Sequence, residues 1–393
     1  MQTRLCTLIL ICTQAFGLSV SCYSTGLKTL CRLPEVVAET SGVELTGNNE
    51  IWTINDSSGQ NMLYLCDTLG NLVRSVLVNG AINEDWEELT QDASGNFYIG
   101  DIGNNENKRQ NLRIYKIPSP VNTETQSVDA QTITFKYPDQ TEFPPADDQL
   151  DFDCEAMIWF NHYLYLFSKN RSLPVRTNLY RIPDEPGDYV AEKIGSFASG
   201  GSDLEETSIY SYWITAADIS PNGKQVALLS HDQVWVFYNF TGDDFFSGDY
   251  KTYDLSSSTQ KESICFANNS TLYLTDEYWS FFDIGRNLYR LTISTPFSTS
   301  SADSLDNPKN EVLIYPNPFS QMLHVSGQNL SDYQLQLLNT KGELTQLFVP
   351  QNSEIDLQLA SLPNGIYLLK FVNKNTGYSW VDKIIKQDKK AGY

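Results

Sequence analysis

The feature that most constrains the fold is a four-part unit that recurs along residues 24–298. Four copies open with a glutamate that is followed by small or aliphatic residues, namely Glu39, Glu87, Glu155 and Glu262. A divergent fifth copy opens near Ala217, between the third and the last. In most copies a second apolar run ends in Asp or Asn, and a third run resembles Leu-Tyr-x-Ile. The copies begin between 45 and 68 residues apart, which is typical of blade-like repeats with loop insertions.

The runs within each copy predict strands, because they are short, rich in β-branched and aromatic residues and separated by Gly, Asn and Asp. Four-stranded sheets arranged radially leave only short, protected edges, so the repeat predicts an all-β chain with a β-propeller over residues 22–298. We count five blades, with residues 27–33 supplying the fourth strand of the last copy. A sixth blade within residues 200–212 is the alternative.

The composition excludes several partners. The chain has 393 residues, 48 of them acidic and 27 basic, for a net charge of −21. Apolar residues make up 41%, enough for a large core and too many for a disordered chain. Binding to nucleic acid or to an anionic membrane depends on clustered Lys and Arg, which this acidic body lacks. We therefore expect neither as a partner.

The amino end has the pattern of a secretory signal peptide. Arg4 precedes an apolar run over residues 5–20, with the small residues Ser19 and Ser21 after its centre. A membrane anchor is the alternative, but the run is short for a spanning helix and polar residues interrupt it. We assign residues 1–21 to the signal peptide and expect no transmembrane segment after its removal.

The carboxyl end has a different pattern. Residues 299–311 are rich in Ser, Asp and Asn and predict a linker, and residues 312–393 alternate apolar residues with Gly and Asn turns. This alternation predicts a small antiparallel β-sandwich. Three short motifs stand out in this part of the chain, formed by Pro316, Asn317 and Pro318, by Gly365 and Tyr367, and by Lys383 and Lys386.

These three motifs, in this order, resemble the C-terminal sorting domain of the type IX secretion system of Bacteroidetes-type bacteria. The resemblance implies that the signal peptide brings the chain to the periplasm and that the secretion machinery is the partner of residues 312–393. It also implies a secreted protein or one held at the outer-membrane surface. An ordinary accessory binding sandwich is the alternative, since a fold alone does not identify a function.

The repeat region resembles the phytase-like and regucalcin-like propellers of secreted bacterial proteins. The resemblance is carried by Asn-Asp-Ser-Ser-Gly from Asn55, Asp-Trp-Glu-Glu-Leu from Asp85 and Tyr-Ile-Gly-Asp-Ile-Gly-Asn-Asn from Tyr98. It implies metal-dependent hydrolysis or ligand binding at a central mouth. The chain lacks the cluster of Lys and Arg that a phytate site needs.

Acidic positions of the repeat are expected to meet at one mouth of the propeller. The start of a first strand and the end of its antiparallel neighbour lie at the same edge of a sheet. The predicted mouth residues are Glu39, Asn55, Asp56, Glu87, Asp101, Asn104, Glu155, Asn170, Asp232, Glu262 and Asp276. Oxygen ligands with almost no nearby His or Cys favour Ca²⁺, with Glu87, Asp101, Glu155 and Glu262 as predicted ligands. The alternative is that these residues form turns, or ion pairs with cations such as Lys169.

Catalytic signatures are few. The sequence has no G-x-S-x-G, H-E-x-x-H or nucleotide-binding glycine motif. His231, beside Asp232, is the one candidate general base. Two function classes therefore remain: a secreted propeller that binds a cation and a ligand or partner at its acidic mouth, and a metal-dependent hydrolase of phosphoric or carboxylic esters that uses the same residues. Whether the chain is an enzyme is left open by the sequence.

Overall fold

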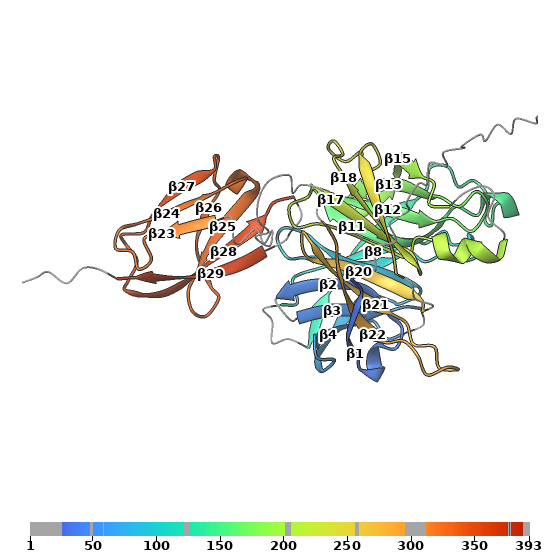
Figure 1. Cartoon of the computed structure of the whole chain (residues 1–393), viewed down its shortest axis with the longest axis horizontal. Helices are drawn as coiled ribbons and strands as arrows, with labels where there is room; N and C mark the ends of the chain where they lie inside the picture. The colour runs from blue at the N-terminus through green and yellow to red at the C-terminus, as the bar shows by residue number, and fades with distance from the viewer. Residues whose placement is uncertain are drawn as a thin grey trace, which may run out of the picture.

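The computed structural model describes residues 26–47, 50–57, 59–121, 126–200, 206–255, 259–294, 312–375, 377 and 379–387 (Figure 1). The predicted signal peptide, residues 1–21, and the predicted linker, residues 299–311, lie outside these ranges. The described helices are short 3-10 helices, and none of them could cross a membrane. They are η1 (Glu35–Val37), η2 (Asp147–Gln149), η3 (Glu206–Tyr212) and η5 (Leu330–Asp332).

Strands of the described part of residues 26–294 form five sheets, and each sheet starts from one strand that we call its first strand. The first strands are β2 (Thr40–Gly47), β6 (Trp86–Gln91), β11 (Asp153–Phe160), β16 (Ala216–Ile219) and β20 (Lys261–Asn268). Each first strand contacts the next in chain order, and β20 also contacts β2. The sheets are therefore arranged around a common centre in a propeller-like way.

From its first strand, each sheet continues outward through strands that mostly follow in chain order. The first sheet adds β3 (Glu50–Asn55), β4 (Met62–Asp67), β5 (Leu72–Asn79) and β9 (Ser127–Asp129). The second adds β7 (Phe97–Asp101), β8 (Arg113–Ile117), β10 (Gln131–Lys136) and β14 (Gly187–Val190). The third adds β12 (Tyr163–Lys169), β13 (Thr177–Pro183) and β15 (Glu192–Phe197). The fourth adds β17 (Gln225–Leu229), β18 (Gln233–Tyr238) and β19 (Asp249–Asp254). The fifth adds β21 (Thr271–Asp276), β22 (Asn287–Thr292) and β1 (Lys28–Arg32).

The amino end of the described chain completes the last sheet. Strand β1 pairs antiparallel with β22, so that Lys28 lies opposite Arg290 and Arg32 opposite Asn287. This confirms that residues 27–33 supply the fourth strand of the last copy. The alternative of a further blade within residues 200–212 is not supported by the described part of that segment. Residues 206–212 form η3, and Ile209 of η3 packs with Val175 and Trp213.

Two outer strands pair with a neighbouring sheet, which the sequence pattern did not predict. Strand β9 lies between β8 and β10 in the chain, yet it pairs parallel with β5 of the first sheet. Strand β14 lies between β13 and β15, yet it pairs parallel with β10 of the second sheet. Each of these short segments therefore hydrogen-bonds the outer edge of the preceding sheet and covers it.

The core lies between adjacent sheets. Strand β3 is buried on both faces, with Ile51, Trp52 and Ile54 all inaccessible to solvent. This two-sided burial explains why the strands read as continuous apolar runs and not as alternating ones. Between the first and second sheets, Trp52 meets Phe97 edge to face, with ring centroids 6.0 Å apart.

Buried carboxylates also link the first strands to one another, away from the strand ends that form the mouth. Glu44 Oε1 accepts a hydrogen bond from the Gln91 amide at 3.0 Å. Glu88 Oε2 accepts from the Ala217 amide at 3.1 Å, which joins β6 to β16. Asp218 Oδ2 in turn accepts from the Phe266 amide of β20 at 2.6 Å. These links satisfy backbone donors that the ladders leave free.

Residues 312–387 form a separate sandwich of two antiparallel sheets beside the larger body (Figure 1). One sheet contains β23 (Val312–Tyr315), β24 (Met322–Gly327) and β27 (Glu354–Gln358). The other contains β25 (Tyr333–Leu338), β26 (Leu344–Phe348), β28 (Gly365–Asn373) and β29 (Ser379–Lys386). Their facing sides share one apolar core that includes Leu323, Leu335 and Phe371. The Asn161 amide donates to Asn375 O at 3.2 Å, which joins the sandwich to the β11–β12 turn.

The three carboxyl-terminal motifs meet at one end of this sandwich. Asn317 Nδ2 donates to Lys383 O at 3.0 Å, and Asn317 Oδ1 accepts from the Ile385 amide at 2.9 Å. Gly365 lies opposite Lys386 across the β28–β29 ladder, and Lys386 is buried. The Asn317 side chain therefore extends the hydrogen bonding of β29 as a strand backbone would. This gives the Pro-Asn-Pro motif a structural role.

Candidate functional site

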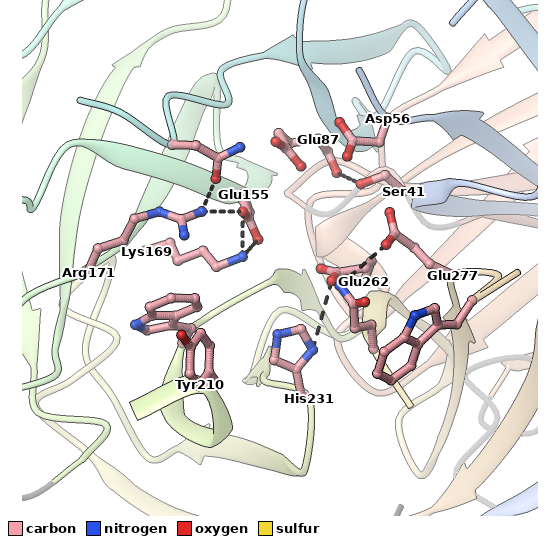
Figure 2. Close-up of a pocket in the computed structure, with 14 residues that line it drawn as sticks. Ser41, Asp56, Glu87, Glu155, Lys169, Arg171, Tyr210, His231, Glu262 and Glu277 are labelled. Carbon is pink, nitrogen blue, oxygen red and sulfur yellow. Dashed lines mark hydrogen bonds and ion pairs between the residues drawn. The ribbon is translucent and has the colours of Figure 1, made fainter. Parts of the chain in front are cut away.

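A pocket of about 470 Å³ opens where the first strands begin and the second strands end (Figure 2). The side chains that line it are Ser41, Asp56, Glu87, Asn105, Glu155, Lys169, Arg171, Tyr210, Trp213, His231, Gln260, Glu262, Glu277 and Trp279. We call it the mouth pocket. Of the predicted mouth residues, the structure brings Asp56, Glu87, Glu155 and Glu262 together here, along with the candidate base His231.

β-Bulges set three of the four glutamates that line the pocket apart from the regular pairing of their strands. The ladder between first and second strand shifts register around Glu87, around Glu155 and around Glu262, so each of these residues is the extra one. In β2 the equivalent extra residue is Gly42, with φ +58°. Bulges re-aim side chains next to functional sites. They explain why one position of the repeat supplies a carboxylate to the pocket from three sheets.

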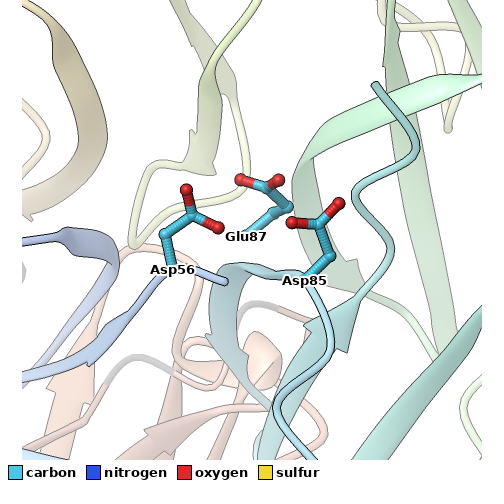
Figure 3. A group of neighbouring side chains, drawn as sticks. All are labelled: Asp56, Asp85 and Glu87. Atoms are coloured by element: carbon cyan, nitrogen blue, oxygen red, sulfur yellow. The ribbon is translucent and has the colours of Figure 1, made fainter. Parts of the chain in front are cut away.

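Three carboxylates stand close enough to share a cation (Figure 3). Asp56, Asp85 and Glu87 each offer one oxygen atom, and these atoms lie within 4.8 Å of one another. We call these residues the carboxylate triad. Asp56 follows β3, Asp85 precedes β6, and Glu87 is the bulged residue of β6. Only oxygen donors are present, which suits Ca²⁺ better than zinc.

A glycine makes room for the triad. A Cβ atom on Gly103 would lie 2.3 Å from Glu87 Oε1 and 2.4 Å from Asp85 Oδ2. Real Cβ atoms do not approach oxygen this closely, so only glycine lets both carboxylates occupy their positions. The donor set of the triad fits a hard divalent cation held by carboxylate oxygen atoms.

The triad is costly to ionise. Burial, and then the charge of Glu277, raise the pKa of Asp56 to about 8. Burial, and then Asp153, raise the pKa of Asp85 to about 6. Burial and the neighbouring Glu155 also raise the pKa of Glu87. An opposite charge at this point would favour the ionised forms of all three.

The opposite wall of the pocket pairs its charges internally (Figure 2). Lys169 Nζ donates to both carboxylate oxygens of Glu155, and both residues are buried. Arg171 Nε donates to Asp153 at 2.7 Å. The Lys169 ammonium and the Arg171 guanidinium lie 5.3 and 4.7 Å from the ring centroid of Trp213. Glu155, a predicted metal ligand, is thus engaged by a cation of the chain, as the ion-pair alternative expected.

Asp101, another predicted metal ligand, does not line the pocket. Its side chain is fully buried, and its two oxygens accept from Arg109 at 2.9 Å and from Arg113 at 2.8 Å. A carboxylate held by two guanidinium groups has no free charge for a cation. Among the described residues, the carboxylates placed to share a cation are Asp56, Asp85 and Glu87, and the sequence analysis named only Glu87 of these as a metal ligand.

The remaining predicted mouth residues do not line the pocket, namely Glu39, Asn55, Asn104, Asn170, Asp232 and Asp276. Several serve turns and ladders instead. Asn55 Nδ2 donates to Val36 O at 2.8 Å, and Asn104 Nδ2 donates to Phe152 O at 3.0 Å. Asp232 accepts from Ser211 Oγ at 2.7 Å. This is the turn role that the alternative interpretation assigned to them.

His231 reaches the pocket next to Glu262. Its Nδ1 lies 3.8 Å from Glu262 Oε1 and forms no hydrogen bond with the described residues. Burial, followed by the positive charges of Lys169 and Lys261, lowers the pKa of His231 to about 3. The imidazole is therefore neutral at neutral pH, and its lowered pKa makes it a weak base.

The sequence analysis missed Asp85 and Glu277 as site residues. Both lie close to predicted mouth residues, since Asp85 lies two residues before Glu87 and Glu277 directly follows Asp276. Asp276 is buried and accepts from Tyr289 Oη, whereas Glu277 lines the pocket. Side chains alternate between the two faces of a regular strand, but the bulge in the first strand breaks this alternation, so the sequence held no signal that separates Asp276 from Glu277.

Comparisons with known proteins bear mainly on the carboxyl end. Residues 313–387 match the family described as "Secretion system C-terminal sorting domain". No curated protein matches the chain. Among solved structures, the chain is similar to PorZ, an essential bacterial surface component of the type-IX secretion system of Porphyromonas gingivalis, with 10% identity and a TM-score of 0.31. That match covers 88% of this chain and 45% of PorZ, so the chain spans less than half of that protein.

Two further solved structures resemble the chain over 68% of its length. One is the PQQ-bound aldose sugar dehydrogenase of Streptomyces coelicolor, with 8% identity, a TM-score of 0.40 and 97% of that chain covered. The other is a protein of unknown function from Bacteroides thetaiotaomicron, with 11% identity, a TM-score of 0.38 and 75% covered. Similarities this distant say nothing about the ligand of the mouth pocket.

The sorting-domain match covers the same strands and motifs that the sandwich brings together at the Asn317 end. Such a domain marks the chain that carries it for secretion or for export to the cell surface. The chain is thus a cargo of type IX secretion, with its C-terminal sorting domain at residues 313–387.

Proposed function

We propose that this cargo is a five-bladed propeller that binds a divalent cation, Ca²⁺, at the carboxylate triad and a ligand or partner in the mouth pocket beside it. The observation that carries the proposal is the triad itself: three carboxylates with oxygen atoms within 4.8 Å of one another, facing a glycine that leaves space for them. A bound Ca²⁺ would supply positive charge that offsets the mutual repulsion of Asp56, Asp85 and Glu87.

The proposal includes the route that residues 1–21 and 312–393 suggest. The signal peptide takes the chain to the periplasm, and the sorting domain engages the type IX machinery for passage to the outer surface. The sandwich contacts the β11–β12 turn, at the end of β11 away from Glu155. This placement supports a mouth pocket that is open to a ligand while the sorting domain is attached.

The test is elemental analysis of the mature chain, residues 22–393, after desalting from a calcium-containing buffer. We expect about one Ca²⁺ per chain, and loss of the ion in Asp85→Asn because the triad then keeps only two charges. Glu39→Gln is the matched control, since Glu39 is exposed and lies outside the pocket. Retention of equal calcium by Asp85→Asn, or no calcium in the unaltered chain, would refute the cation site.

A metal-dependent hydrolase of phosphoric or carboxylic esters is the second candidate, and it is supported by the place of His231 in the same pocket, with its Nδ1 3.8 Å from Glu262 Oε1. His231 would accept a proton from an attacking water, and a bound cation would polarise the ester. The assay is hydrolysis of p-nitrophenyl phosphate and p-nitrophenyl acetate with Ca²⁺. An enzyme should lose nearly all turnover in His231→Gln, whereas a binding propeller shows no turnover above buffer in either protein.

A further inference from the structure

An exposed apolar surface borders the mouth pocket. The segment between β21 and β22, residues 277–286, is called the rim loop here. Its exposed apolar side chains are Trp279, Phe281, Phe282 and Ile284, with exposed fractions of 49, 83, 55 and 38%. Phe282 lies 4.8 Å from Trp279 and 4.8 Å from Phe281, measured between ring centroids. Aromatic residues gathered in one exposed patch mark an interaction site.

The rim loop is fixed to the body of the fold. The Trp279 amide donates to Ile284 O at 2.8 Å and closes the loop on itself. The Tyr278 amide donates to Ala38 O at 2.8 Å, and Asp283 forms an ion pair with Arg32 at 2.7 Å. The patch is therefore presented at a set position on the rim, which lowers the entropy lost when a partner binds.

The patch and the pocket are continuous. Trp279 belongs to both, and Glu277, two residues earlier, lines the pocket beside Glu262. Among the described residues, no Lys or Arg forms an ion pair with Glu262 or Glu277, since Lys169 and Arg171 are paired with other carboxylates. The half of the pocket next to the rim loop is therefore acidic, and it adjoins Asp56 of the carboxylate triad.

From this juxtaposition we infer that the pocket receives the Lys or Arg side chain of an extended peptide segment whose neighbouring apolar residues pack on the rim loop. The inference rests on the proposed function, because it names the ligand that shares the pocket with the cation. The cationic group would pair with Glu262 and Glu277 and lie against the face of Trp279. A pocket of about 470 Å³ holds one long side chain comfortably.

Charge and chemistry favour a peptide over other partners. The net charge of −21 opposes nucleic acid and anionic membranes. Phe281, Phe282 and Ile284 offer no hydrogen bonds to sugar hydroxyls, whereas aromatic side chains are enriched where proteins bind proteins. An acidic pocket beside an aromatic platform thus fits a basic residue flanked by apolar ones.

The test is selection from a synthetic hexapeptide library on the immobilised mature chain in calcium-containing buffer, read by sequencing the retained pool. We expect Lys and Arg to be enriched about fivefold at one position next to apolar residues. Phe281→Ser with Phe282→Ser should abolish the apolar preference, and Glu277→Gln should abolish the basic one. Leu69→Ser, which changes an exposed apolar residue elsewhere, should leave both preferences intact.

The same preparations are titrated with Ca²⁺ by calorimetry, so that the two proposals fail separately. Loss of peptide selection with calcium binding retained in the Phe281→Ser/Phe282→Ser variant supports the inference. The inference is overturned if the retained peptides show no enrichment of Lys or Arg, or if neither variant changes their sequences. The calcium titration still tests the carboxylate triad independently. Binding of chitosan oligomers in place of peptides would also overturn it, since that result assigns the acidic pocket to an amino sugar.

Discussion

Gly103 shows how a single atom decides what the mouth pocket holds. The backbone at Gly103 approaches Asp85 and Glu87 so closely that a methyl group would occupy the space of their oxygen atoms. The two carboxylates could then keep neither their spacing nor their distance from Asp56. The proposed binding of a cation thus depends on a residue that supplies no ligand.

Gly103→Ala should therefore weaken Ca²⁺ binding by about tenfold or more, because Asp85 and Glu87 must move apart to admit the new Cβ. Isothermal titration measures the effect. Gly365→Ala is the control, since no heavy atom lies within 4 Å of the Cβ it adds. Equal affinities in the two variants would show that Gly103 does not support the site.

Lys169 and Glu155 form the buried ion pair of the opposite wall. Lys169→Met should cost about 3–5 kcal/mol of unfolding free energy, because the buried Glu155 then keeps only the longer ion pair with Arg171, at 3.6 Å. Adding Glu155→Gln should recover most of the loss. Denaturant unfolding of the single and double variants checks this, and no recovery in the double variant would contradict the pairing argument.

The carboxylate positions of the repeat were predictable from sequence, but the direction of each side chain was not. Glu87, Glu155 and Glu262 reach the pocket because each is the extra residue of a bulge. A bulge leaves no mark in the apolar pattern, so strand-end residues such as Asp101 and Glu277 could not be assigned a face. Arg109 and Arg113, which take Asp101 out of the site, come from a loop and a third strand.

At the scale of elements, β1 completes the fifth sheet and joins the two ends of the repeat region. Its prediction succeeded because the last copy has only three strands of its own and residues 27–33 carry the missing apolar run. The strands β9 and β14 were not predicted, because short polar segments without alternation carry no signal for pairing with a neighbouring sheet. The 3-10 helix η3 was not predicted either, because a segment of seven residues is too short for a helical apolar pattern to show.

Deleting residues 28–32 should lower the melting temperature of the mature chain by about 10 °C or more, since the edge of β22 is exposed and Leu33 loses its burial. Scanning calorimetry measures the shift. The control is a chain from which only residues 22–25 are deleted, because it retains β1. An unchanged melting temperature would mean that β1 does not close the fold.

In the sorting domain, the Asn317 side chain links the Pro-Asn-Pro motif to β29. Asn317→Ala removes two hydrogen bonds to β29 and should cost the domain about 1–2 kcal/mol. Denaturant unfolding of residues 312–393 within the full chain, monitored by the fluorescence of Trp380, measures this loss of stability. Gln328→Ala, at an exposed turn, should change nothing, and a similar loss in both variants would remove the special role of Asn317.

At the scale of the whole molecule, the acidic excess reaches the centre of the fold. Glu44, Glu88 and Asp218 come from three first strands and lie near Cys265 of a fourth. Burial raises the pKa of Asp218 to about 7, and it also raises the pKa values of Glu44 and Glu88. The folded chain thus holds protons that the unfolded chain releases above pH 4.

The sign of the pH dependence follows from this. A carboxyl whose folded pKa is raised contributes stability that is present below its unfolded pKa and is lost as the pH rises through the folded value. For Asp218 the window runs from about pH 4 to about pH 7. Stability without calcium should fall from pH 5 to pH 8, and Asp218→Asn should reduce that slope. Urea unfolding at several pH values measures it, and a slope unaffected by the substitution would contradict the assignment.

The central claim is that the carboxylate triad binds Ca²⁺ at the mouth of the propeller. A crystal structure of the mature chain grown with CaCl₂ tests it most directly, with anomalous scattering to identify the ion. The account predicts one calcium ion coordinated by oxygen atoms of Asp56, Asp85 and Glu87 above Gly103. A calcium-free pocket, or an ion bound by other residues while the triad stays protonated, would contradict it.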